Sequence, residues 1–262
     1  MPSQPFDFTG ETGQKLSGRL DLQEGPAIAH VLFAHCFTCN KNSIAAARIA
    51  RGLTARGYGV LRFDFTGLGD SGGDFADSSF SGNVRDLVAA ATAMRGAGRP
   101  PSILIGHSLG GAAVLAAEAD IPEIVAVATI GAPVDADHVS HLFAGGLDEI
   151  MARGEAEVGI GGRPFTIRRA FVEDLAAHDQ RARIAGLRGA LLVLHSPQDV
   201  TVGIENAHGI FLAARHPRSF VSLAGADHLL TSPQDADYVA AVVTAWASRY
   251  LPADEPRRSD SL

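Results

Sequence analysis

Apolar runs of the kind that form fully buried strands alternate with amphipathic helical patterns along most of this chain. Strands that are apolar on both faces are typical of a parallel sheet with helices packed on each side. Between the runs a helical spacing recurs, as in Val84, Leu87, Val88 and Ala91. The alternation predicts an α/β fold with a mostly parallel central sheet. The apolar runs cover residues 27–34, 59–65, 102–106, 124–130, 190–195 and 219–223.

Composition and charge narrow the class of protein. Of the 262 residues, 46% are hydrophobic and 19% are charged, which is enough to bury a core that needs no disulfide or metal. The formal net charge of −7 argues against nucleic acid or an anionic membrane as the main partner. No segment reads as a secretory signal or as an apolar membrane span. The two cysteines, Cys36 and Cys39, are too few for a disulfide framework, so we expect a cytoplasmic location.

The predicted core consists of residues 1–133 and 188–252, and the segment 134–187 interrupts it. That segment holds no apolar run of the same kind and is richer in Gly, Arg and Glu, with short helical pieces such as 168–177. Because a long excursion between two core strands is usually functional, we predict a lid over the site. The alternative is a surface insertion that only covers a helix. Residues 253–262 are expected to form a disordered tail.

The strongest motif is Gly106-His107-Ser108-Leu109-Gly110, a G-x-S-x-G placed where a predicted strand runs into a helix. Such a sharp turn lifts the serine hydroxyl above the sheet, and its glycines let the backbone pass without Cβ clashes. The helix N-terminus brings free N–H groups to Ser108, where they can hold an oxyanion. The alternative is a structural Ser N-cap followed by close packing at the glycines.

A serine nucleophile needs a base, and the base needs a carboxylate that orients it. Both must come from loops at the carboxyl ends of the parallel strands. Asp199 and His228 each lie in the short segment after one of the last two apolar runs, and the chain order Ser108, Asp199, His228 fits this arrangement. Asp135 and Asp137 follow another strand at the same edge and are fallback candidates for the acid.

The other histidines fit weaker roles. His138, His141 and His178 lie in the predicted lid, where one of them is placed to touch a substrate. His107 is expected to point away from Ser108. For the acid and the base themselves, the structural alternatives are a turn-forming aspartate and a surface-loop histidine.

Cys36-Phe37-Thr38-Cys39 is a C-x-x-C between a strand and a helix, the place of a thioredoxin-like redox pair. That alternative leaves the G-x-S-x-G turn unexplained and belongs to a much shorter domain. Zinc is disfavoured because no second Cys or His pair stands at ligand spacing. In a hydrolase this loop supplies the second oxyanion N–H. We assign that role to Phe37, with Leu109 as its partner. The cysteines are then packing residues, and oxidation-sensitive cysteines are the alternative.

The segment Gly67-Leu68-Gly69-Asp70-Ser71-Gly72 matches a G-x-G-x-x-G pattern after a strand. A dinucleotide site requires such glycines to open a helix directly. Here the next helix is expected only near Ser81, so a bound pyrophosphate would face no helix N-terminus. We therefore predict no organic cofactor.

Together these motifs resemble the α/β-hydrolase superfamily over almost the whole chain. Two segments, FAHCFTCNKN and RFDFTGLGDSGGDF, are similar to the hydrolase halves that occur fused to an OsmC-like domain in bacteria. The superfamily commonly has His-Gly before the oxyanion residue, whereas Cys36 stands at that glycine position. The matching segments are His35-Cys36-Phe37, residues 63–71, residues 106–111, Asp199 and His228.

The resemblance implies an α/β-hydrolase fold with a small lid insertion and a serine hydrolase that cleaves carboxylic esters of small acyl groups. Thioesters or other acyl groups are related substrates of the same chemistry. Ser108 attacks the carbonyl, His228 takes its proton, Asp199 orients His228, and the Phe37 and Leu109 N–H groups hold the oxyanion. We expect no cofactor, no metal and a small-molecule ester as partner. A hydrolase-fold binding protein without catalysis is the remaining alternative.

Overall fold

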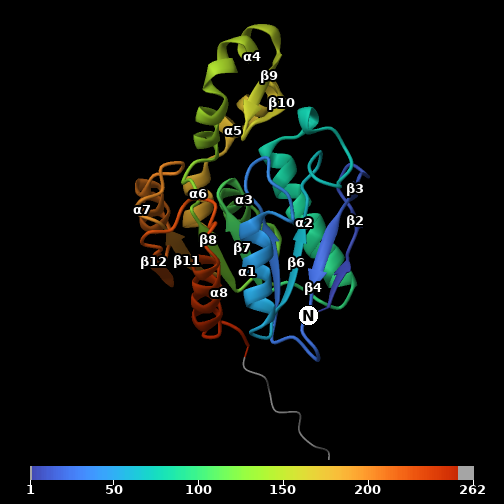
Figure 1. Cartoon of the computed structure of the whole chain (residues 1–262), viewed down its shortest axis with the longest axis vertical. Coiled ribbons are helices and arrows are strands. Elements are labelled where there is room, and N and C mark those ends of the chain that lie inside the picture. The colour runs from blue at the N-terminus through green and yellow to red at the C-terminus, as the bar shows by residue number, and fades with distance from the viewer. Residues whose placement is uncertain (1, 253–262) are drawn as a thin grey trace, which may run out of the picture.

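The computed structural model describes residues 2–252, and an eight-stranded sheet runs through its centre (Figure 1). The strand order is β1-β4-β6-β5-β7-β8-β11-β12. All pairs from β6 to β12 are parallel, while β1 and β4 add an antiparallel edge. The predicted mostly parallel sheet is confirmed. The strands are β1 (Ser3–Pro5), β4 (Gly18–Asp21), β5 (His30–Ala34), β6 (Gly59–Phe63), β7 (Ile103–His107), β8 (Ala126–Ile130), β11 (Ala190–His195) and β12 (Arg218–Ser222).

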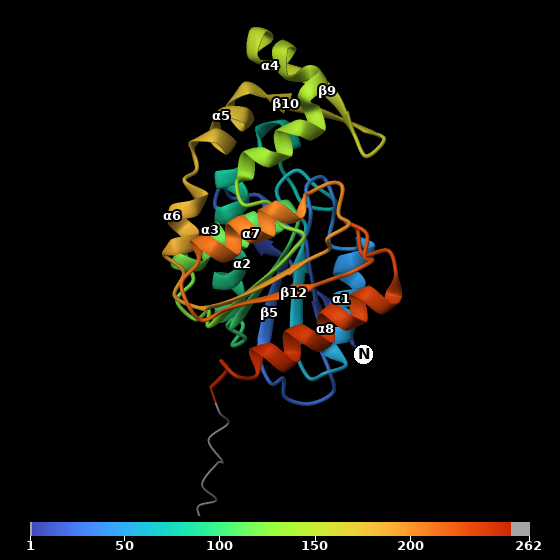
Figure 2. The same cartoon turned by 90° about the vertical axis from the view of Figure 1, so that its left-hand side faces the viewer.

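Helices cover both faces of the sheet, and Figure 2 shows them on opposite sides. One face packs against α1 and α8, which also contact each other. The other face packs against α2, α3 and α7. The two hydrophobic cores therefore lie on either side of strands that are buried on both faces. These helices are α1 (Ile44–Thr54), α2 (Phe80–Gly96), α3 (Leu109–Ala117), α7 (Ile204–Ala213) and α8 (Pro233–Ala247).

The N-terminal residues form two small antiparallel pieces. A separate hairpin of β2 (Phe8–Thr9) and β3 (Lys15–Leu16) precedes β4.

Helix α2 begins at Phe80 and is capped by the Ser79 hydroxyl, which accepts from the Gly82 N–H. The sequence analysis expected this helix near Ser81, one residue after its observed start.

The segment between β8 and β11 rises beyond the carboxyl edge of the sheet (Figure 1). It contains a two-stranded antiparallel hairpin that the sequence analysis did not predict, although Ala156, Val158 and Ile160 are buried in alternation. Its last helix packs against α3 and α7 of the core. The segment comprises a 3₁₀ stretch (Ala136–Gly146), α4 (Leu147–Arg153), β9 (Glu155–Ile160), β10 (Arg163–Arg168), α5 (Arg169–Ala177) and α6 (Gln180–Ala185).

The structure leaves two of the sequence-based predictions untested. The predicted tail, 253–262, lies outside the described residues. The domain division at 134 and 188 stays a prediction.

Among residues 2–252, no helix is both long and apolar enough to cross a membrane. The thioredoxin-like alternative is wrong, because the eight-stranded order belongs to a different fold.

Candidate active site

Ser108 sits on the sharp turn between β7 and α3, with a positive φ of 55°. Two glycines make this turn sterically possible. A Cβ on Gly106 would lie 2.3 Å from the Gly110 carbonyl oxygen, and one on Gly110 would lie 2.4 Å from the His35 carbonyl oxygen. The backbone holds the turn through the Ser108 N–H, which donates to the Ile130 carbonyl at 2.9 Å. The hydroxyl is thereby raised at the carboxyl edge of the sheet.

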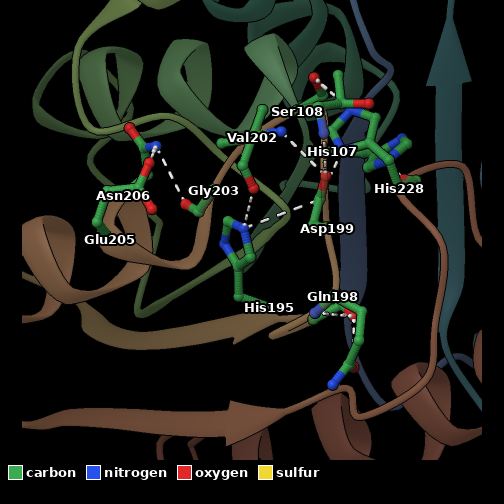
Figure 3. Close-up of polar contacts among 12 residues, drawn as sticks. His107, Ser108, His195, Gln198, Asp199, Val202, Gly203, Glu205, Asn206 and His228 are labelled. Atoms are coloured by element: carbon green, nitrogen blue, oxygen red, sulfur yellow. Dashed lines mark hydrogen bonds and ion pairs between the residues drawn. The ribbon is translucent and has the colours of Figure 1, made fainter.

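The structure brings Ser108, His228 and Asp199 into one chain of hydrogen bonds (Figure 3). His228 Nε2 lies 3.1 Å from Ser108 Oγ, and His228 Nδ1 lies 2.7 Å from Asp199 Oδ2. The imidazole comes from the loop after β12, and the carboxylate from the loop after β11. Both side chains are nearly buried, with exposed fractions of 10% and 2%. The hydroxyl can pass its proton to the imidazole, whose orientation the charged carboxylate holds.

The Asp199 carboxylate is held as an acceptor. Its Oδ1 accepts from the backbone N–H groups of Thr201 and Val202, each at 2.9 Å. Burial acts to raise the pKa of Asp199, but the bonds from His228 and these N–H groups outweigh it, so the pKa is lowered. The other carboxylate oxygen, Oδ2, is therefore a charged acceptor for the Nδ1–H of His228. Gln198 ties the two loops together, because its Oε1 accepts from the Gly225 N–H at 2.8 Å.

Two histidines that the sequence analysis gave no role support this chain (Figure 3). His107 Nε2 lies 2.7 Å from the His228 carbonyl oxygen, so its N–H fixes the backbone of the base. Burial, followed by the nearby His228, lowers the pKa of His107 to about 4, so this ring is neutral at physiological pH. His195 is fully buried, with Nε2 at 2.7 Å from the Val202 carbonyl oxygen and 3.8 Å from Asp199 Oδ2.

Gly131 leaves room for the acid and the base. It directly follows β8 and has a positive φ of 54°. A Cβ at this position would lie 3.3 Å from Asp199 Oδ2 and 3.4 Å from His228 Nδ1. The absence of a side chain thus keeps the contact between the two groups free of steric pressure. No sequence motif pointed to Gly131.

The loop after β5 faces the nucleophile turn. Within the described residues, the N–H groups of Phe37 and Leu109 donate to no carbonyl. Cys36 is buried, as expected of a packing residue, and it forms a disulfide with Cys39 across this loop. A four-residue loop brings the two Cα atoms to 5.3 Å, within bonding range for a disulfide.

A buried ion pair anchors the far end of this loop. Lys41 donates to Asp64 through both its backbone N–H and Nζ, at 2.5 Å each, and Nζ also meets Asp70 at 2.7 Å. The side chains of Lys41 and Asp64 are 7% and 1% exposed. Burial acts to lower the pKa of Lys41, but the bonds to Asp64 and Asp70 outweigh it and raise the pKa. Asp70 belongs to the G-x-G-x-x-G segment, which therefore serves this anchor.

Two small pockets flank the nucleophile turn. One has a cavity volume of about 10 Å³ and is closed on the segment side by His138, Val139, His141 and Leu142. The second has a similar volume and lies among aromatic rings on the side of the β5 loop. Both volumes match a single water molecule. The aromatic rings of the second pocket are Phe37, Phe65, Phe75 and Phe171.

A second serine also meets a histidine and an aspartate. Ser81 Oγ lies 2.9 Å from His178 Nε2 and 2.5 Å from Asp174 Oδ1. Here the carboxylate binds the serine itself, while its distance to the imidazole is 3.7 Å at the same Nε2. Among residues 2–252 no carboxylate bonds the ring from its far side, so this cluster lacks the order of a nucleophile, a base and an orienting acid. It ties α5 to the start of α2, where Asp174 also accepts from the Ser81 N–H.

The fallback acids lie away from the site. Asp135 is exposed and faces Arg181 at 3.8 Å, and Asp137 accepts from the Ser140 hydroxyl at 2.7 Å. Within the part of the chain that the structure describes, no cluster of three potential metal ligands occurs.

The fold and the site geometry define the chain as an α/β hydrolase. It belongs to the serine aminopeptidase S33 family, whose model matches residues 25–196. The structure is similar to the esterase domain of a Rhodothermus marinus protein, with 48% identity and a TM-score of 0.80. That likeness covers 96% of this chain and 100% of the other.

More distant relatives share the same fold. The mitochondrial palmitoyl-protein thioesterase ABHD10 of Mus musculus is 27% identical over 187 residues, which cover 69% of this chain. The chain matches 57% of that relative's length. A solved structure of mouse alpha/beta hydrolase domain-containing protein 10 has a TM-score of 0.77 at 20% identity, covering 94% of this chain and 99% of the other. The resemblance to OsmC-fused hydrolases stays a prediction.

Proposed function

We propose that the chain is a serine hydrolase that cleaves carboxylic esters of small acyl groups. The observation that carries this proposal is the continuous hydrogen-bond chain from Ser108 through His228 to Asp199, with bonds of 3.1 and 2.7 Å. Each group has the position that its role requires: a raised nucleophile, a base within proton-transfer distance, and a charged acceptor behind the base.

In this mechanism His228 Nε2 takes the proton from Ser108 Oγ as the oxygen attacks the ester carbonyl. Asp199 accepts a hydrogen bond from the Nδ1–H of His228, which fixes the tautomer and stabilises the imidazolium. The imidazolium then gives its proton to the leaving alcohol. Water repeats the sequence on the acyl-enzyme and releases the acid. His107 is a positioning residue, because its bond to the His228 carbonyl oxygen fixes the loop of the base.

We assign the oxyanion hole to the N–H groups of Phe37 and Leu109. Leu109 opens α3, so its N–H has no partner inside the helix and adds to the positive end of the helix dipole. Phe37 lies on the loop against which the Gly110 backbone packs. Two N–H donors in such a site stabilise the transition state by several kcal/mol. Removing one such donor raises the activation free energy by about 3–4 kcal/mol.

The pockets support a small acyl group. The volumes of about 10 Å³ on each side of the turn suit a methyl-sized group. A palmitoyl chain, as in the palmitoyl-protein named for the mouse relative, is far larger than either volume. We therefore expect activity on p-nitrophenyl esters to fall steadily from acetate to decanoate. Activity that rises with acyl length would contradict this substrate class.

We further propose a cytoplasmic location and a small-molecule ester as the partner. The location rests on the cysteine count, because two cysteines make at most one bridge and no disulfide framework. Cell fractionation that places the protein outside the cytoplasm would contradict the location without affecting the proposed chemistry.

A fluorophosphonate probe tests the nucleophile, because it reacts with activated serines. We expect the probe to label the wild type and to spare Ser108→Ala. Ser81→Ala is the matched control, because Ser81 also contacts a histidine and an aspartate, and we expect it to keep full labelling. Labelling that survives Ser108→Ala would contradict the proposal and favour the non-catalytic alternative at this turn.

A further inference from the structure

The Cys36–Cys39 disulfide encloses the residue to which we assign the second oxyanion N–H. Phe37 and Thr38 are the only residues between the two bonded cysteines, so the bridge fixes the peptide that carries the Phe37 N–H. The Cys39 N–H donates to the Cys36 carbonyl at 3.1 Å and closes the same turn. This loop occupies the position where the superfamily commonly has a glycine before its oxyanion residue.

The backbone inside the bridge adopts a conformation that its sequence disfavours. Thr38 has a φ of 56°, and a β-branched residue rarely occupies this left-handed region. Such a conformation persists only where its surroundings enforce it. Arg163, on the β9–β10 hairpin, binds the Thr38 carbonyl, and the ring of Phe37 stacks on Phe171 at 5.6 Å. These contacts hold the outer side of the loop, while the disulfide constrains its backbone directly.

We propose that the Cys36–Cys39 disulfide is a positioning element of the oxyanion hole, and that its reduction lowers the rate of hydrolysis. This inference rests on the proposed function. With the bridge open, Thr38 relaxes toward negative φ, and the Phe37 N–H turns away from the carbonyl that Ser108 attacks. The catalytic hydroxyl, imidazole and carboxylate stay in place, because the hydrogen bonds that join them do not involve the bridge.

The redox step needs a two-electron reductant. In the cell a dithiol would serve: its two thiols form a disulfide, and Cys36 and Cys39 receive two electrons and two protons. In the test tube a phosphine serves without adding a competing thiol nucleophile. It becomes a phosphine oxide with the oxygen of one water molecule, whose two protons complete the two thiols.

The test compares kcat and KM for p-nitrophenyl acetate before and after phosphine reduction of the wild type. Mass spectrometry after iodoacetamide treatment counts the free thiols in each sample. We expect kcat to fall about 10- to 100-fold, with KM within about twofold, because one oxyanion donor is misplaced. Cys36→Ser/Cys39→Ser is expected to match the reduced wild type and to be insensitive to phosphine. Circular dichroism verifies that each sample is folded.

The outcomes separate this inference from the proposed function. Two alkylated cysteines with unchanged kcat would overturn the positioning role, as would a chain purified without reductant that is fully active with both thiols free. A fall in kcat on reduction of the wild type carries the inference even where the double variant fails to fold. Loss of the proposed function would appear separately, as activity that survives Ser108→Ala.

Discussion

Ser108 Oγ and His228 Nε2 lie 3.1 Å apart although 120 positions separate them in the chain. Each side chain follows a strand of the same parallel sheet, and the carboxyl ends of those strands meet at one edge. The contact is therefore a product of topology. Its precision comes from neighbouring residues, chiefly His107 on the base and the N–H groups of Thr201 and Val202 on the acid.

Replacing Asp199 with asparagine tests the orienting carboxylate. An amide cannot stabilise the imidazolium, and its NH₂ group favours the wrong tautomer of His228, so we expect kcat to fall by about 10³-fold or more. The matched control is Asp227→Asn, beside His228 but bonded to Thr231, with activity expected within twofold of the wild type. Steady-state hydrolysis of p-nitrophenyl acetate measures both. A fall of less than tenfold in Asp199→Asn would exclude the assigned role.

Gly131→Ala tests the space between the acid and the base. The new methyl group would press on Asp199 Oδ2 and His228 Nδ1 from 3.3 and 3.4 Å, so we expect kcat to fall at least tenfold. The positive φ also costs stability, by about 1 kcal/mol. Gly98→Ala has the same backbone cost, at a φ of 71°, with open space around the new Cβ. If both variants lose the same stability and the same activity, the steric account of Gly131 is wrong.

Removing the carboxylate of Asp64 tests the loop anchor. Asp64→Ala leaves the buried ammonium of Lys41 with only the exposed Asp70 as partner, so we expect the free energy of unfolding to drop by about 3–5 kcal/mol. Urea denaturation measures this change. The exposed pair Arg153–Glu149 provides the control, and Arg153→Ala is expected to cost less than about 0.5 kcal/mol. Equal losses in the two variants would argue against a buried anchor.

The buried carboxylate of Asp86 makes the stability of the fold depend on pH. Burial raises its pKa to about 6, against the bonds from Thr66. Between pH 4 and 6 the folded state binds more protons at Asp86 than the unfolded state, so this group's contribution to stability falls as pH rises. In Asp86→Asn this fall in stability with rising pH is absent, because an amide does not titrate. We expect its stability relative to the wild type to rise by about 2–3 kcal/mol from pH 4 to 7. A pH-independent difference in urea denaturation would contradict this account.

The sequence alone predicted the parallel sheet and the three residues of the hydrogen-bond chain, because strand ends and chain order determine which side chains share an edge. It did not predict His107, His195 or Gly131, since their roles depend on distances between loops that no local pattern encodes. The β9–β10 hairpin had a readable signal in the alternation of Ala156, Val158 and Ile160. The C-x-x-C spacing fits a thiol pair and a disulfide equally well, so only the structure distinguished them.

Trapping the acyl-enzyme tests the central claim most directly. The chain is mixed with p-nitrophenyl acetate, quenched in acid during turnover, digested and analysed by mass spectrometry. Our account predicts one acetyl group on the peptide that contains Ser108, and none on that peptide in Ser108→Ala. Rapid turnover with no acetylated peptide, or with the acetyl group on another residue, would contradict it.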